Sequence, residues 1–91
     1  MNTAYILMVQ YNAQAIIPLA RVVEDYFPHL TLNQFIRRSA VGDITIPVIR
    51  IDPRSQKTAK GVHVADLVRY IERRREAAQK EVKQLSGTPP E

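Results

Sequence analysis

The sequence predicts a small α+β fold that forms one domain over residues 1–85, followed by a disordered tail over residues 86–91. Two short segments on either side of Pro28 repeat apolar residues with the period of a helix. A segment rich in β-branched residues follows Gly42, and a long charged stretch compatible with a helix closes the domain. We therefore expect a few short strands packed against helices.

The first element that we expect is a strand over Tyr5–Val9. This run is mostly strand-favouring and too short for a stable helix of its own. It is apolar on both faces, as expected of a strand that is covered on both sides. We therefore expect it to be buried or paired with a second subunit.

Pro18 marks the beginning of the first helix, which ends before Pro28. The fixed φ of proline suits the first helical position. The apolar face of this helix follows the i, i+3, i+4, i+7, i+8 spacing and consists of Leu19, Val22, Val23, Tyr26 and Phe27.

A second short helix is expected between Thr31, which can cap its N-terminus, and Gly42, which supplies a left-handed stop. Its polar residues are Asn33, Gln34, Arg37 and Arg38. Two helices joined by a tight turn, the second with amides and guanidiniums outward, outline a helix-turn-helix. The alternative is a plain helical hairpin with a solvated polar face.

Residues 44–51 are expected to form a strand that Pro47 confines to an edge, and residues 62–64 a second strand. The polar loop between them carries Arg54, Lys57 and Lys60. A strand, a basic loop and a strand form a wing, whose cations can follow a phosphate backbone. The combination of helix-turn-helix and wing favours DNA binding over a neutral scaffold.

The last element is a helix expected from Ala65 to Leu85. An alternating four-three spacing, interrupted by Arg75, joins Val64, Val68, Ile71, Arg75, Ala78, Val82 and Leu85. This seam is short for a coiled coil, and a docked helix with a frayed basic end is the alternative. We expect at least a dimer, formed through Tyr5, Leu7, Val9, Val82 and Leu85.

The net charge of +4 arises entirely from residues 50–91, because residues 1–49 are electrically balanced. A basic half indicates a polyanionic partner, most commonly nucleic acid, or else a soluble surface that happens to be basic. The three glycines allow neither a dinucleotide fingerprint nor a phosphate-binding loop. With two histidines and no cysteine, we expect no metal, no cofactor and no catalysis, and we find no signal for export or membrane insertion.

The chain resembles the pyocin activator protein family, small bacterial transcriptional activators of phage-tail-like bacteriocin and prophage genes. The resemblance runs from Thr3 to Ala78. It is carried by YILMVQY, AIIPLARVVEDYFPHLT, FIRRSAVGDITIPVIRI and SQKTAKGVHVADLVRYIERRREAA. The order of helix, turn, helix, wing and Asp-Leu helix is also similar to phage excisionases and regulators of the winged-helix type.

The resemblance implies a winged helix-turn-helix that binds double-stranded promoter DNA in the bacterial nucleoid and activates transcription, with RNA polymerase as a further partner. By position, the recognition helix contributes Thr31, Asn33, Gln34, Arg37 and Arg38. The wing contributes Arg54, Ser55, Gln56, Lys57 and Lys60. Two alternatives remain, an excisionase-like protein that bends DNA and a protein-interaction module without DNA affinity.

Overall fold

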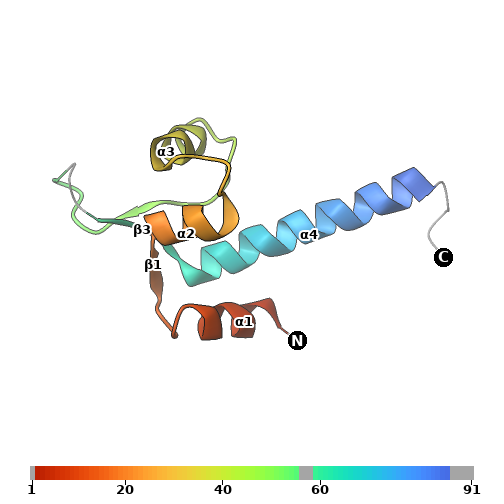
Figure 1. Cartoon of the computed structure of the whole chain (residues 1–91), viewed down its shortest axis with the longest axis horizontal. Helices are drawn as coiled ribbons and strands as arrows, with labels where there is room; N and C mark the ends of the chain where they lie inside the picture. Colours follow the sequence, from red (N-terminus) through yellow and green to blue (C-terminus); the bar gives the residue numbers. More distant parts are fainter. Residues whose placement is uncertain (1, 56–58, 87–91) are drawn as a thin grey trace.

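The computed structural model describes residues 2–55 and 59–86 and confirms the predicted α+β class (Figure 1). Four helices surround a three-stranded antiparallel sheet with the strand order β1-β3-β2. The elements are α1 (Thr3–Gln10), β1 (Ile16–Pro18), α2 (Leu19–Tyr26), α3 (Leu32–Ala40), β2 (Ile49–Arg50), β3 (Lys60–His63) and α4 (Val64–Ser86).

The central strand of the sheet, β3, pairs with both of its neighbours at Gly61. This residue lies opposite Pro18 of β1 and Ile49 of β2. A Cβ atom at position 61 would lie 2.9 Å from the carbonyl oxygen of Ile17, which is closer than real Cβ contacts. Glycine is therefore required where β1 approaches β3.

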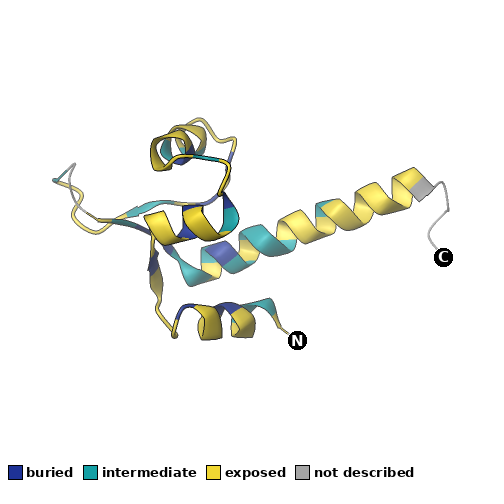
Figure 2. Ribbon diagram, viewed as in Figure 1, coloured by how far each residue is buried: buried dark blue, intermediate teal, exposed yellow. Residues whose placement is uncertain are grey.

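The core joins α2, α3 and α4 through one aromatic cluster. The ring of Phe27, directly after α2, lies 5.0 Å from Phe35 of α3 in an edge-to-face arrangement and 5.9 Å from Tyr70 of α4. Edge-to-face pairs add a favourable quadrupole interaction to the burial of the rings. Figure 2 shows the buried residues gathered where α2, the sheet and the first half of α4 meet.

The predicted first helix is confirmed with a shift of one residue at its start. Pro18 is the last residue of β1 and the N-cap of α2, which begins at Leu19. Leu19, Val22 and Val23 are buried, as their spacing predicts. The helix ends at Tyr26, ahead of Pro28.

The predicted strand over residues 44–51 is shorter in the structure, where only Ile49 and Arg50 form β2 at the edge of the sheet. Ile44 and Ile46 are buried in the core without belonging to a strand. Pro47 has no amide to donate to a ladder, so the segment reaches strand pairing only after it. The partner strand β3 begins at Lys60 and ends at His63, so Val64 already belongs to α4.

The predicted N-terminal strand over Tyr5–Val9 is wrong, because these residues lie in helix α1. The side chain of Asn2 caps this helix by accepting from the amide of Ala4 at 2.7 Å. Leu7 and Tyr11, one turn apart, are both buried, so helical spacing places two large apolar groups on one face. The strand of this region is β1, which the sequence analysis did not predict.

Helix α1 is attached to α2 and α4 by polar contacts at both of its ends. The Tyr11 hydroxyl donates to Asp25 Oδ2 at 2.6 Å, and the Thr3 hydroxyl donates to the carboxylate of Glu72. Burial raises the pKa of Tyr11, and the bond to Asp25 raises this pKa further. Beyond the turn, the amide of Val64 donates to the carbonyl of Ala15 at 2.8 Å.

The long C-terminal helix agrees with the predicted bounds to within one residue at each end. Its 23 residues span about 34 Å at 1.5 Å per residue. Leu67 is buried, and Val68, Tyr70 and Ile71 pack against the core. Past Arg75 the helix leaves the body of the protein and is mostly exposed (Figures 1 and 2).

We predict that Leu7→Ala lowers the free energy of unfolding by about 2–5 kcal/mol, because it leaves a cavity under α1. The neighbouring Met8→Ala is the control. Leu7 is 2% exposed and Met8 is 49% exposed, so the control should cost far less. Urea denaturation of the two variants measures the difference. Equal losses would contradict the helical placement of this segment.

Candidate nucleic-acid interface

The N-terminus of α3 is fixed by a capping box formed by Thr31 and Gln34. The Thr31 Oγ1 accepts from the amide of Gln34 at 3.1 Å, and the amide of Thr31 donates to Gln34 Oε1 at 2.9 Å. The two bonds satisfy amides that have no partner within the helix. The predicted cap at Thr31 is confirmed, and Thr31 and Gln34 have a structural role in addition to any contact with a ligand.

Helix α3 ends at Ala40, and Gly42 supplies the predicted left-handed stop two residues later. The φ of Gly42 is +85°, and the amide of the following Asp43 donates to the carbonyl of Arg38 at 2.9 Å. The Ser39 hydroxyl donates to the carbonyl of Ile46 at 3.3 Å. These bonds hold the segment after α3 against the helix and set the direction in which the chain approaches β2.

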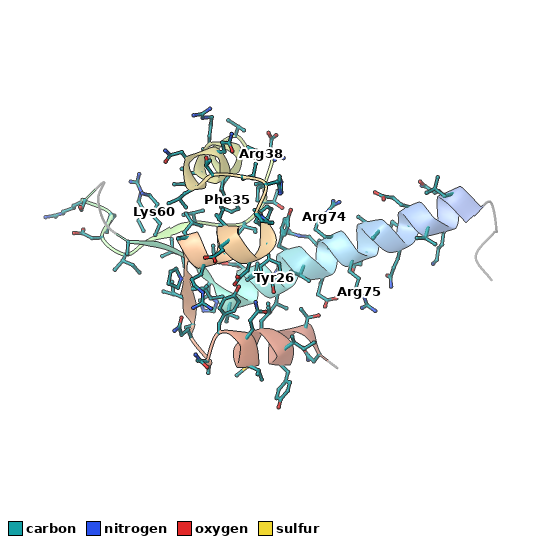
Figure 3. All side chains as sticks on the ribbon, in the orientation of Figure 1. Tyr26, Phe35, Arg38, Lys60, Arg74 and Arg75 are labelled. Atoms are coloured by element: carbon teal, nitrogen blue, oxygen red, sulfur yellow. The ribbon has the colours of Figure 1, made fainter. Side chains whose placement is uncertain are left out.

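The outer face of α3 carries the polar residues that the sequence analysis singled out. Asn33 and Arg37 lie one turn apart, as do Gln34 and Arg38, and all four residues are exposed. Phe35 lies on the opposite side of the helix, between α3 and α2 (Figure 3). Within the part of the chain that the structure describes, no carboxylate pairs with Arg37 or Arg38. The outer face therefore presents its guanidiniums to solvent.

The hairpin of β2 and β3 occupies the position predicted for the wing. After β2, the Asp52 Oδ1 accepts from the amide of Arg54 at 3.0 Å, and the Asp52 carbonyl accepts from the amide of Ser55 at 3.2 Å. This turn leaves Arg54 exposed. The predicted wing residues Gln56 and Lys57 lie outside the described residues.

A groove of about 570 Å³ separates α3 from the hairpin. It is lined by Ile36, Ser39, Ala40, Gly42, Ile44, Thr45, Ile46, Pro47, Val48, Arg50 and Lys60. Arg50 and Lys60 are the charged residues of this lining, and Figure 3 shows Lys60 on the side of the hairpin that faces α3. The groove therefore lies between the predicted recognition helix and the predicted wing and is lined by residues of both.

Arg50 is a candidate interface residue that the sequence analysis missed. It lies opposite Lys60 in the pairing of β2 with β3. Arg50 is the one basic residue within residues 44–51, and a single cation in a strand is a weak indication of an interface. The pairing register that aligns it with Lys60 depends on the length of the loop, and the sequence pattern does not define that length.

A contact from α4 supports the same segment from its other side. The Nη2 of Arg73 donates to the carbonyl of Thr45 at 3.0 Å and to its Oγ1 at 3.3 Å. Two other arginines of α4 form surface ion pairs within the helix, Arg69 with Asp66 and Arg75 with Glu72. Arg73 is thus a structural support of the interface.

The residues predicted for self-association are divided between surface and core. Leu7 belongs to the core of its own chain, so it is not part of a surface. Tyr5 and Val9 are exposed on α1, and Val82 and Leu85 are exposed near the end of α4.

Among the described residues, no group of three or more His, Cys, Asp or Glu side chains could hold a metal ion. Within the same part of the chain, no helix has both the length and the apolar character needed to cross a membrane.

A comparison with protein-family models matches residues 3–78 to the family described as pyocin activator protein PrtN. The match extends from α1 into α4 and includes all of the interface described above. No curated protein and no solved structure matches the chain.

We predict that Thr31→Ala lowers the free energy of unfolding by about 0.5–2 kcal/mol, because it removes the side-chain cap of α3. Thr31→Ser keeps the hydroxyl and serves as the control. Thermal or urea denaturation measures both variants. A Thr31→Ser protein as unstable as Thr31→Ala would show that the hydroxyl does not stabilise the helix.

Proposed function

The chain belongs to the pyocin activator protein family, and on this premise we propose that it activates transcription by binding double-stranded promoter DNA in a sequence-specific manner. The promoters that we propose are those of phage-tail-like bacteriocin or prophage genes. The family supports the regulatory role, and the geometry of α3 and the hairpin supports the mode of binding.

The observation that carries the proposal is the outer face of α3. An α-helix fits the major groove of DNA, where amides pair with adenine and guanidiniums with guanine. Asn33, Arg37 and Arg38 are exposed on this helix without an acidic partner among the described residues. Gln34 keeps its amide NH₂ as a donor, because only its oxygen accepts in the capping box.

The hairpin supplies the second part of the proposed contact. Arg50 and Lys60 of the hairpin line the groove beside α3, so a duplex in contact with α3 is proposed to contact the hairpin as well. Arg54 and Lys60, together with the loop residues Ser55, Gln56 and Lys57, are proposed to follow the phosphate backbone or the minor groove. Cations placed there displace counterions from DNA, which favours binding and makes it dependent on salt.

We propose RNA polymerase as the second partner, because an activator that binds a promoter acts on the enzyme that transcribes from it. The site of action is then the nucleoid, within the cytoplasm of the bacterium. An excisionase-like protein that bends DNA uses the same order of helices and hairpin. A reporter that contains the promoter and no recombinase separates the two, since only an activator raises its expression.

We also propose self-association with a second copy through the end of α4. Val82 is 65% exposed and Leu85 is 87% exposed, and with Ala78 they form one stripe that continues the four-three spacing of Val68 and Ile71. The body of the protein covers the first half of this seam and leaves the second half bare (Figure 2). An apolar stripe with four-three spacing can pack against the same stripe on the α4 helix of a second copy.

For DNA binding, we predict that Arg37→Ala or Arg38→Ala costs about 1–3 kcal/mol on the promoter site and less on random DNA, because a side chain that reads a base loses a specific contact. Titrations of promoter and random duplexes at one salt concentration measure the two losses. Equal losses on both duplexes would make these residues contacts to the backbone only.

For self-association, we predict that Val82→Glu combined with Leu85→Glu converts a dimer into a monomer, because it places charges in the apolar stripe. Gln84→Glu adds a charge to the same helix away from the stripe and should leave the dimer intact. Sedimentation equilibrium measures the masses. A mass near 10.4 kDa for the unmodified chain at high concentration would overturn the proposal.

A further inference from the structure

Two positive charges face each other on the hairpin, and among the described residues no carboxylate forms an ion pair with either of them. Arg50 and Lys60 are directly paired between β2 and β3, so their side chains lie on the same face of the sheet. Like charges in this position destabilise a strand pair. Both residues line the groove between α3 and the hairpin, and no acidic residue is among the described residues that line it with them.

The surroundings of this pair are apolar. The groove has Ile36, Ile44, Ile46 and Val48 along its wall. Lys60 also borders a second hollow of about 270 Å³, which extends to Leu32 at the start of α3. Lys60 is half-buried beside this wall, whereas Arg50 is exposed. Water therefore screens the charge of Lys60 less, which strengthens its attraction for an anion.

We propose that Arg50 and Lys60 bind a phosphate of the DNA strand that crosses the groove between α3 and the hairpin. This inference rests on the proposed function. In a duplex, one sugar–phosphate strand separates the major groove from the adjacent minor groove. A protein that places α3 in the major groove and its hairpin loop in the minor groove must accommodate that strand between them. The apolar wall then contacts deoxyribose carbons, and the cationic pair meets the phosphate.

The proposal explains why the destabilising pair is present. A bound phosphate lies between two cations that repel each other in the free protein, and it converts the repulsion into two attractive contacts. The same contacts hold the hairpin in a fixed position relative to α3. The pair therefore fixes the position of the protein on the duplex, while the outer face of α3 reads the bases.

The first test uses Arg50→Gln and Lys60→Gln, with Lys80→Gln on the exposed part of α4 as the control that removes the same charge elsewhere. The dependence of affinity on salt is measured on promoter and random duplexes. Each groove variant should reduce the slope of log K against log salt by about one on both duplexes. Lys80→Gln should leave the slope unchanged. Groove variants with the slope of the unmodified protein would overturn the proposal.

The second test needs no DNA and uses inorganic tripolyphosphate as the probe. Tripolyphosphate should raise the melting temperature of the unmodified protein and of Lys80→Gln, and should raise it less in Arg50→Gln and Lys60→Gln. Without the probe, the groove variants should melt at the same temperature as the unmodified protein or higher, since a repulsion is removed. A lower melting temperature for both variants would show that the pair stabilises the free hairpin, and would overturn the proposal.

The two tests separate this inference from the proposed function. A protein that binds no duplex, but whose response to tripolyphosphate depends on Arg50 and Lys60, has the anion site and another function. A protein that binds the promoter, and whose groove variants respond to salt and to tripolyphosphate as the unmodified protein does, has the function and lacks this site.

Discussion

The packing of Phe27 against Phe35 and Tyr70 is the contact on which the other parts of the structure depend. Phe27 lies in the turn between α2 and α3, and its ring meets one aromatic side chain from α3 and one from α4. One residue thereby sets the angle between the two helices of the turn and attaches both to the long helix. Pro28 ends α2 directly after it, so the turn cannot extend as a helix. The orientation of the outer face of α3 follows from this contact.

The same arrangement determines how the hairpin lies beside α3. The segment after Gly42 is held to α3 by Ser39 and to α4 by Arg73, and its isoleucines are buried in the core. β2 consequently begins at a fixed distance from α3, and β3 returns from it to α4. The groove between helix and hairpin is a product of these attachments, and it gives the proposed DNA strand a defined place.

Helices α1 and α4 extend the fold beyond the pair of helices α2 and α3 and the hairpin of β2 and β3. α1 is anchored by Leu7 and Tyr11 and leaves its other large apolar side chains in solvent. α4 supports the interface through Tyr70 and Arg73 and then continues past the body of the protein. One helix thus contributes both to the rigidity of the surface proposed to bind DNA and to the proposed contact between two copies.

The sequence by itself determined the elements that local rules define. The cap at Thr31, the stop at Gly42 and the span of α4 follow from side-chain hydrogen bonds, a left-handed φ and continuous helix-compatible residues, and each was predicted. The polar face of α3 was also predicted, because helical periodicity alone decides which residues share a face.

The tertiary structure alone decided the state of Tyr5–Val9 and the position of Arg50. Five apolar residues satisfy a strand or a helix equally well, and the choice depends on the surface of α4 and α2 against which Leu7 and Tyr11 pack. Arg50 lies opposite Lys60 only through the pairing register of two short strands, which depends on the length of the loop between them. The helical state of Tyr5–Val9 and the position of Arg50 both depend on tertiary contacts. Such contacts leave no periodic pattern in the sequence.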